Sequence, residues 1–307
     1  MLVRAVISGA TGAIGMALVE LLEVSEIETL VLCRADSKRI ARIKESKYIR
    51  VAECSLDQMK SFSLENDKKY DVFFHFAWAG TWGEARSDLY LQNENVRYTL
   101  DAVELAARLG CKKFIGAGSQ AEYGRYEGII SPKTPAYPEN GYGIAKLCAG
   151  QLSREQASKH KMDHIWVRIL SVFGPYDSDK TMVMSAVRKL LAGEIPSFTP
   201  AEQLWDYIYS KDAARAFLAL AENGKSGEVY CLGSGCSVPL CEYVYKIRDA
   251  IDKDAPLGIG DVPYADRQVM HLQADISKLT QHTGFAPRYS FEEGIKETVA
   301  WAKANPS

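Results

Sequence analysis

The sequence predicts an α/β protein built on a doubly wound parallel sheet. Short apolar runs alternate with longer amphipathic stretches in the first half of the chain, as expected when helices connect the strands of a parallel sheet. The first apolar run ends in a glycine-rich turn that leads directly into a helix-like stretch. With 307 residues, the chain is long enough for one large domain or two smaller ones around a well-buried core.

The expected elements follow this rhythm along the chain. Strands are expected at residues 2–8, 29–34, 48–54, 71–76, 112–116 and 165–173. Helices are expected at 14–23, 88–109 and 143–160, the second closed by Gly110 as its C-cap. The pattern then becomes irregular, with loops at 193–200 and 255–263, helices near 212–222 and 291–302, and a strand near 227–232. We predict one domain from residues 1–170 and 205–235, and a smaller, discontinuous C-terminal lobe from 171–204 and 236–307.

Composition excludes several classes of protein. The net charge is −2, from 37 basic and 39 acidic residues, which argues against binding to nucleic acid or to an anionic membrane. No segment resembles a signal peptide or a membrane span. The seven cysteines are scattered without a C-x-x-C pair, so neither a disulfide framework nor a metal site is indicated. We expect a cytoplasmic protein whose cysteines are mostly small core residues.

The glycine-rich turn has the spacing G-x-x-G-x-x-G. Its residues are Gly9, Thr11, Gly12, Ala13, Ile14 and Gly15, together with Ala10. Glycines at these places permit a tight turn and let backbone amides approach a pyrophosphate, while the following helix directs its free N–H groups and partial positive charge at the phosphates. The turn therefore predicts a Rossmann-like dinucleotide-binding domain, and the C-terminal lobe is left to bind the substrate.

The end of the second strand indicates which cofactor is bound. Arg34 stands where an acidic residue would accept hydrogen bonds from the ribose of NAD, and Lys38 and Arg39 follow closely. A guanidinium pairs well with a 2′-phosphate. NADP(H) is therefore favoured. NAD(H) remains possible because a shifted loop could present Asp36, and a solvated basic loop is the remaining alternative.

Tyr142 and Lys146 form a Y-x-x-x-K pair that places both side chains on one helix face. An ammonium near a phenol lowers the phenol's pKa, so Lys146 and an oxidised nicotinamide together can tune Tyr142 for proton transfer. Two other pairs occur by chance spacing, Tyr176/Lys180 and Tyr207/Lys211. Only Tyr142 begins a long helix and follows a polar strand end, which carries Ser119. We predict Ser119, Tyr142 and Lys146 as the catalytic residues.

Further motifs extend along most of the chain. They are D-x-x-x-H-x-A at 71–77, Asn95, S-x-x-x-Y-G at 119–124, a segment similar to R-L-x-N-V-Y-G-P at 168–175, one similar to D-F-I-Y-V-x-D at 206–212, and a C-terminal signature at 275–278 and 284–287. On these motifs the chain resembles an extended short-chain dehydrogenase/reductase of the nucleotide-sugar epimerase/dehydratase/reductase group.

The resemblance implies a small-molecule nucleotide-sugar substrate and roles for particular residues. Ala77 and Asn95 would border the cofactor, together with Tyr142 and Lys146. The sugar would face Thr81, Trp82, Ser119, Gln120 and Ala121, and Arg267 would pair with the nucleotide diphosphate. The helices at 88–109 and 143–160 would form a homodimer interface. We expect His75 to be a buried core histidine, whereas Trp78 and Trp82 fit hydrophobic packing and a site role equally well.

Departures from the motifs narrow the function. Dehydratases of this group carry Asp-Glu directly after the catalytic hydroxyl residue, where this chain has Gln120 and Ala121; Glu122 should point elsewhere. Dehydration is therefore disfavoured. Ser171 replaces the family asparagine, Ser55 the acidic residue after the third strand, and Trp205 a basic residue, which leaves substrate and adenine contacts open.

Three functions remain after these departures. The leading one is NADPH-dependent reduction of a 4-keto-6-deoxy nucleotide sugar. The first alternative is a nucleotide-sugar 4-epimerase that keeps NAD tightly bound, which Arg34 argues against. The second is a non-catalytic, dinucleotide-sensing binding protein, which retention of the Tyr142/Lys146 pair argues against.

Overall fold

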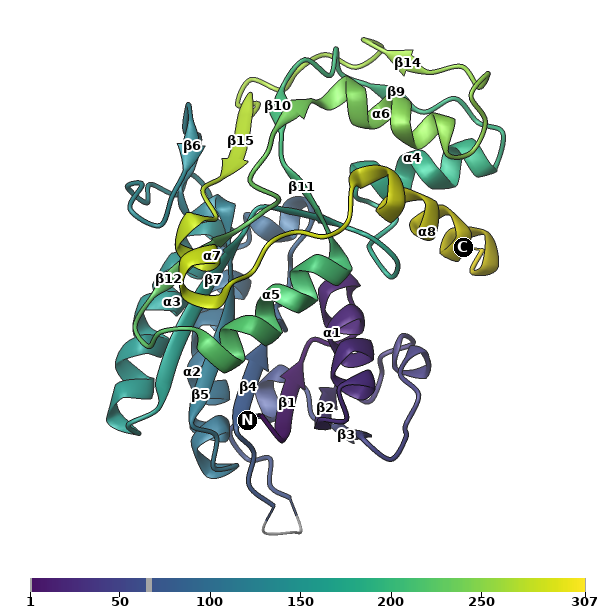
Figure 1. The fold of residues 1–307 in the computed structure, drawn as a ribbon. Helices are drawn as coiled ribbons and strands as arrows, with labels where there is room; N and C mark the ends of the chain where they lie inside the picture. Colours follow the sequence, from purple (N-terminus) through teal and green to yellow (C-terminus); the bar gives the residue numbers. More distant parts are fainter. Residues whose placement is uncertain (1, 65–67, 307) are drawn as a thin grey trace.

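The computed structural model describes residues 2–64 and 68–306 and contains a seven-stranded parallel sheet. The strand order is β12-β7-β5-β4-β1-β2-β3, so the chain begins in the middle of the sheet and winds outward in both directions (Figure 1). The strands are β1 (Arg4–Ser8), β2 (Glu28–Cys33), β3 (Ile49–Glu53), β4 (Val72–His75), β5 (Lys113–Ser119), β7 (Asp163–Ile169) and β12 (Val229–Leu232). The predicted fold class is confirmed.

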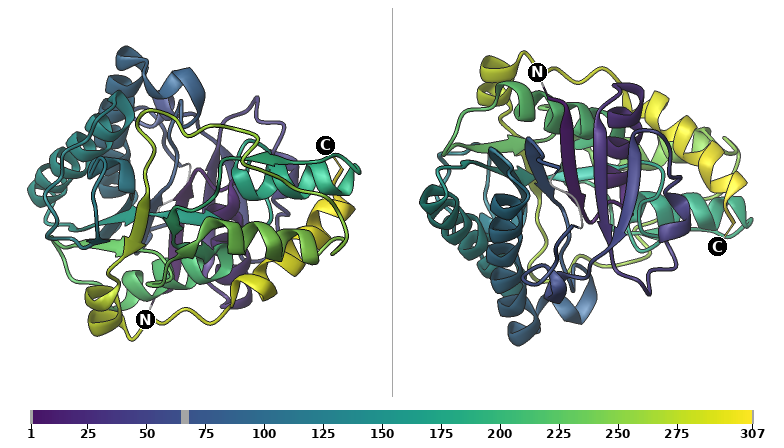
Figure 2. Two further views of the ribbon diagram at one scale, coloured as in Figure 1. Left: turned by 90° about the horizontal axis from the view of Figure 1, so that it is seen from above. Right: turned by 90° about the horizontal axis from the view of Figure 1, so that it is seen from below.

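Helices cover both faces of this sheet. One face packs against α1 (Ala13–Val24), α5 (Ser210–Asn223) and α7 (Ser277–Thr283), and the other against α2 (Leu89–Arg108) and α3 (Gly141–Lys159), which lie side by side (Figure 2). Neighbouring strand residues divide between the faces. Ile7 and Phe74 belong to the core under α1 and α5, whereas Val6 and Phe73 belong to the core under α2. This alternation explains why the strands read as continuous apolar runs.

The C-terminal part of the chain has an apolar core of its own. Helices α4 (Met182–Leu191), α6 (Leu240–Asp249) and α8 (Phe291–Ala304) pack against one another around it. A four-stranded sheet joins β13 (Val238–Pro239), β10 (Leu204–Trp205), β15 (His271–Ala274) and β6 (Ile129–Ile130). Two further strand pairs are β8 (Ser171–Phe173) with β11 (Tyr207–Tyr209), and β9 (Ser197–Phe198) with β14 (Gly258–Ile259).

Several expected elements differ from the structure. The strand expected at 165–173 was wrong as a single element, because the chain breaks at Leu170 and β8 pairs with β11 outside the main sheet. The strand expected at 112–116 continues to Ser119, and α4, α6 and α7 were missed. The two loops expected at 193–200 and 255–263 pair with each other through β9 and β14. The proposed domain division stays a prediction.

The cysteines and helices can be compared with the compositional expectations. All seven cysteines lie among the described residues and are free, and Cys33, Cys54, Cys111 and Cys231 are buried. The expectation that most are core residues is therefore confirmed. Among the described residues, no helix is both long enough and apolar enough to cross a membrane.

Candidate active site

The turn between β1 and α1 has the geometry that a pyrophosphate requires. Gly9 has φ +77°, and a side chain there would collide with the backbone of Ala77, two residues after β4. A Cβ at Gly15 would lie 2.6 Å from Cα of Ala10. Gly12 instead begins α1 without a side-chain cap, and a Cβ there would meet no atom within 4 Å. Free helix N–H groups beside open space form an anion site, so this turn fits the pyrophosphate of a dinucleotide.

A cleft of about 770 Å³ continues from this turn along the ends of the central strands. Of the predicted cofactor residues, Gly9, Thr11, Arg34 and Ala77 line it. Its other walls come from the ends of β2, β3 and β4 and include Asp36, Lys38, Arg39, Cys54, Leu56, Met59, Trp78 and Thr81. A cleft at the carboxyl ends of parallel strands, where the strand order reverses, is where dinucleotides bind in this kind of sheet.

The end of β2 presents both charges considered in the sequence. The Arg34 guanidinium and the Asp36 carboxylate form an ion pair of 3.4 Å, and both side chains are mostly exposed to solvent at the cleft. The cation favours a 2′-phosphate and the carboxylate favours a free ribose hydroxyl. The choice between NADP(H) and NAD(H) therefore depends on which of these two side chains contacts the ribose of the bound cofactor.

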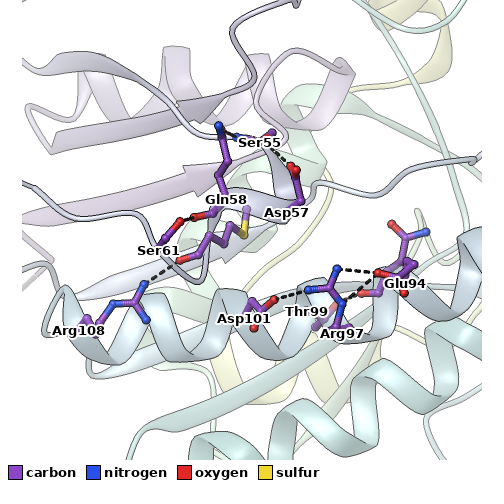
Figure 3. Close-up of polar contacts among 11 residues, drawn as sticks. Ser55, Asp57, Gln58, Ser61, Glu94, Arg97, Thr99, Asp101 and Arg108 are labelled. Carbon is purple, nitrogen blue, oxygen red and sulfur yellow. Dashed lines mark hydrogen bonds and ion pairs between the residues drawn. The ribbon is translucent and has the colours of Figure 1, made fainter.

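The end of β3 forms the other wall of the cleft, and η2 (Leu56–Gln58) begins there (Figure 3). The Ser55 hydroxyl donates to the Asp57 carboxylate, and the Ser55 N–H donates to the Gln58 side chain at 2.9 Å. Arg108 of α2 donates to the Met59 carbonyl at 2.7 Å. Ser55 thus caps a turn, and the segment it begins is anchored to α2.

The predicted catalytic residues lie together at the start of α3. Asn140 caps the helix by accepting from the Gly143 N–H at 2.9 Å. A side chain at Gly143 would collide with the carbonyl of Ala121, so the helix start packs directly on η4 (Gln120–Glu122), which follows Ser119. Ser119 is close enough to Tyr142 to lower the pKa of the phenol as a hydrogen-bond partner. The structure therefore brings Ser119 and Tyr142 together.

Lys146 lies one turn further along α3 with its side chain buried. Its ammonium donates to the Ala117 carbonyl at 2.7 Å and lies 3.7 Å from the centre of the Trp78 ring. Of the three tyrosine/lysine pairs, only Tyr142/Lys146 lies within one helix. Tyr176 and Lys180 lie in a loop, and Tyr207 is in β11 whereas Lys211 is in α5.

Burial has the largest effect on the pKa values of Tyr142 and Lys146. Burial raises the pKa of Tyr142, while the hydrogen bond from Ser119 and the charge of Arg86 oppose that rise. Burial lowers the pKa of Lys146 to about 7, and the negative charge of Glu122 opposes that fall. The expected lowering of the Tyr142 pKa concerns the cofactor-bound enzyme and stays a prediction.

Two residues of α2 hold the loop that follows β4. Asn95 exchanges hydrogen bonds of 2.8 and 2.9 Å with the backbone of Ala79. Gln92 donates to the carbonyls of Gly80 and Ala85, each at 2.8 Å, and accepts from the Trp78 indole at 2.8 Å. Asn95 therefore acts on the cleft through this loop. Gln92 was missed in the sequence, although it lies three residues before Asn95 and so on the same helix face.

Glu122 follows Ser119 by three residues, and its side chain is fully buried. Its carboxylate accepts from the Ser119 N–H at 2.8 Å, the Trp166 indole at 3.0 Å and the Arg168 guanidinium at 2.6 Å. The Trp166 ring fills a slot that lacks side chains, because Gly116, Gly118 and Gly150 are its neighbours there. The expectation that Glu122 points elsewhere agrees with these contacts.

His75 is a buried core residue, as expected. Its Nδ1 atom lies 2.7 Å from the Ser8 hydroxyl, and its Nε2 atom lies 3.5 Å from that of Thr99. Burial lowers its pKa to about 3, with a smaller contribution from the charge of Lys146. A histidine held neutral in this way has no proton to exchange near pH 7, so it contributes to packing.

The residues expected around the sugar are dispersed over the outer part of the site. Thr81 lines the cleft, Trp82 is exposed beside it, Gln120 is half-buried and Ala121 is buried. Arg267 is exposed, and its charge contributes to lowering the pKa of Glu139, after the stronger effect of Arg125. In the C-terminal part, the Trp205 indole donates to the Ser171 hydroxyl at 2.9 Å.

A doubly wound sheet, a glycine turn and a Ser/Tyr/Lys group at the strand ends define a dinucleotide-binding protein of the short-chain dehydrogenase/reductase class. Residues 5–233 match the model of the NAD dependent epimerase/dehydratase family. The chain belongs to this family, whose members form the extended nucleotide-sugar group of that class. The recognition made from the sequence motifs is therefore confirmed.

Individual relatives and structures agree with this membership. The chain is 27% identical over 184 residues to dTDP-glucose 4,6-dehydratase of Escherichia coli, which covers 56% of this chain and half of that protein's length. The fold is similar to UDP-N-acetylglucosamine 4-epimerase of Methanobrevibacter ruminantium, with a TM-score of 0.87, 22% identity and 99% of each chain covered. It is also similar to UDP-glucuronic acid 4-epimerase of Bacillus cereus in complex with NAD, with a TM-score of 0.82, 19% identity, and 98% of this chain and 99% of that chain covered.

Proposed function

We propose that the protein reduces the 4-keto group of a 4-keto-6-deoxy nucleotide sugar with NADPH. The observation that carries this proposal is the cationic group at the end of β2, where Arg34, Lys38 and Arg39 line the cofactor cleft. Such a group pairs with a 2′-phosphate and gains little from a bare hydroxyl. An enzyme that consumes a reduced cofactor in every turnover benefits from that selectivity, whereas an epimerase regenerates its own cofactor.

In the proposed reaction, the Tyr142 hydroxyl gives its proton to the oxygen of the 4-keto group. The Ser119 hydroxyl, which lies beside Tyr142, polarises the same carbonyl. Lys146, held in place by the Ala117 carbonyl and the Trp78 ring, binds the nicotinamide ribose and stabilises the phenolate. The reduced nicotinamide supplies the hydride when it is bound. The amides at Gly12 hold the pyrophosphate at the other end of the cleft.

The same contacts argue against dehydration. Elimination of water needs an acid and a base beside the catalytic hydroxyl, where this chain has Gln120 and Ala121. The nearest carboxylate, Glu122, is engaged by Trp166, Arg168 and the backbone of Ser119. It is therefore unavailable for acid or base catalysis on the sugar.

A nucleotide-sugar 4-epimerase with bound NAD is the second candidate. The observation that favours it is the Asp36 carboxylate, which lies in the same cleft beside Arg34. The structural similarity to two 4-epimerases adds weight to this candidate. A non-catalytic binding protein is less well supported, because the chain retains Ser119, Tyr142 and Lys146 and the proposed reaction gives each of them a role.

The deciding experiment incubates purified protein with NADPH and a panel of 4-keto-6-deoxy nucleotide sugars that differ in base. Oxidation of one NADPH for each sugar reduced, absent in a Tyr142→Phe variant, would support the reductase. Release of tightly held NAD from the denatured protein, with interconversion of 4-hydroxyl epimers and no net cofactor oxidation, would establish the epimerase instead.

We also propose that the protein is a homodimer through α2 and α3. The observation behind this proposal is that α2 and α3 pack against each other and that each carries exposed apolar side chains, Leu89 and Tyr90 on α2 and Ile144 and Leu152 on α3. Apolar side chains gathered on neighbouring helices favour association. Light scattering at micromolar concentration should give twice the chain mass for the wild type and the single mass for an Ile144→Glu, Leu152→Glu variant. A monomeric wild type would refute the dimer.

A further inference from the structure

Arg86 lies beside the active site without belonging to any motif. It is the last residue of η3 (Gly83–Arg86), between β4 and α2. The central carbon of its guanidinium lies 4.4 Å from the centre of the Tyr142 ring, and the side chain is half-buried. Within residues 2–64 and 68–306, this side chain has no hydrogen bond or ion pair. A half-buried cation whose contact is a tyrosine ring calls for a functional explanation.

The backbone around Arg86 is fixed relative to that ring. Gln92, buried on α2, donates to the carbonyl of Ala85 at 2.8 Å. The Arg86 carbonyl packs against Gly141, since a Cβ there would lie 3.3 Å from it, and Gly141 directly precedes Tyr142. The guanidinium therefore reaches the ring from a segment that is itself held against the start of α3.

Three charged groups face Tyr142 from the elements packed around it. Arg86 comes from η3, Lys146 from the same helix, and Glu122 from η4. The Lys146 ammonium lies further away, 5.8 Å from the ring centre, and is already bound by the Ala117 carbonyl. The charge of Arg86 lowers the pKa of Tyr142 and that of Glu122 raises it. Arg86 is thus the closer of the two cations.

We propose that Arg86 is a positioning residue for Tyr142, whose guanidinium orients the phenol and stabilises the negative charge left on its oxygen when the proton is transferred. The planar cation can lie flat on the ring, whereas a lysine in its place would present only a point charge. The inference rests on the proposed function only for the role of Tyr142 as proton donor.

The test measures the titration of Tyr142 directly. The protein is labelled with fluorotyrosine, and the fluorine NMR resonance of residue 142 is assigned by its absence from Tyr142→Phe. Fluorination lowers the pKa of the phenol, so the titration needs less alkaline solutions. Circular dichroism checks that the protein stays folded over the pH range used. The variants are Arg86→Met, which removes the charge, and Arg86→Lys, which keeps it. Arg97→Met is the matched control.

Arg97 is a suitable control because it also lies over a tyrosine. Its guanidinium carbon is 4.7 Å from the centre of the Tyr98 ring, on the outer face of α2. It pairs there with Glu94 at 2.6 Å and Asp101 at 3.2 Å (Figure 3). Removing it deletes a cation over a tyrosine ring outside the active site.

Arg86→Met should raise the midpoint of the Tyr142 titration by about 0.5 to 1 pH unit, because loss of the cation disfavours the phenolate. Arg86→Lys should restore part of the shift, and Arg97→Met should leave the midpoint unchanged. In the reductase assay, kcat should fall about three- to tenfold with KM unchanged.

Two results would overturn the inference. One is an unchanged midpoint in Arg86→Met; the other is a raised KM with unchanged kcat, which would make Arg86 a substrate anchor. The titration also separates this inference from the proposed function. If no 4-keto sugar is reduced but the midpoint moves, the proposed function fails and the role of Arg86 stands.

Discussion

Trp205 and Ser171 are hydrogen-bonded to each other, the indole nitrogen donating to the hydroxyl at 2.9 Å. They belong to different sheets, since Trp205 is in β10 of the four-stranded sheet and Ser171 is in β8, which pairs with β11. They are also two of the positions where this chain departs from the motifs of the extended reductases, which carry a basic residue and an asparagine there. The two departures are therefore structurally coupled.

Trp205→Phe should lower the free energy of unfolding by about 0.5–1.5 kcal/mol, because the half-buried Ser171 hydroxyl loses its partner. Ser171→Ala should cost a similar amount, and the double variant should cost less than the sum of the two. Urea unfolding of the four proteins measures this coupling. Strict additivity would mean that the hydrogen bond contributes nothing to stability.

Tyr142→Phe should reduce turnover by about two to four orders of magnitude while cofactor affinity stays nearly unchanged, because it removes the proposed proton donor and keeps the ring. Stopped-flow kinetics and cofactor titration check the two parts. Tyr207→Phe is the matched control, since Tyr207 also precedes a lysine by four residues but lies in β11. Wild-type turnover in Tyr142→Phe would refute the assignment and make the other tyrosine/lysine pairs candidates.

NADPH should bind at least about tenfold more tightly than NADH, since one charge-assisted hydrogen bond to the 2′-phosphate contributes about 1.5–3 kcal/mol. Arg34→Ala should remove most of that difference. Asp36→Ala should widen it, because it frees Arg34 from its ion pair and removes a negative charge from the cleft. Fluorescence titration of both reduced cofactors measures the affinities, with Arg97→Ala as a control outside the cleft. Equal wild-type affinities would favour the epimerase.

His164 should make stability depend on pH below neutrality. Burial lowers its pKa to about 4, and its Nε2 atom lies 2.8 Å from the Ser153 hydroxyl. As pH falls below about 6.5, the unfolded chain takes up a proton that the folded protein refuses, so the stability is present above that pH and is lost toward pH 4. His164→Gln should reduce the slope of the unfolding free energy by about 1.4 kcal/mol per pH unit in this window. An unchanged slope in urea titrations would contradict this.

The main sheet could be predicted because each of its strands is an apolar run followed by a turn or cap residue. The break at Leu170 could not, because residues 165–173 contain no glycine or proline that marks it, and β8 leaves the sheet only to pair with β11, more than thirty residues further along the chain. Helices α4 and α6 were missed for a related reason. Each is ten residues long and buries its apolar face against the C-terminal core, so its stability depends on distant partners.

The residues of the candidate site also divide into those that the sequence predicts and those that it does not. Ser119, Tyr142 and Lys146 follow from motif spacing, because one helix and one strand end fix their positions. Arg86 belongs to no motif, and Gln92 is marked in the sequence only by its position three residues before Asn95. Their contacts arise from the path of the chain after β4, which the sequence does not determine locally.

The three glycines around Trp166 allow little variation of the sequence near the end of β5, which carries Ser119. Substitution at Gly116 or Gly118 would place a side chain inside the indole, and substitution at Gly150 would do so from α3. Amides along β5 should accordingly be among the slowest to exchange with deuterium. A laboratory effort to broaden substrate range would find Gln120 open to randomisation, while its neighbour two residues back, Gly118, would admit no replacement.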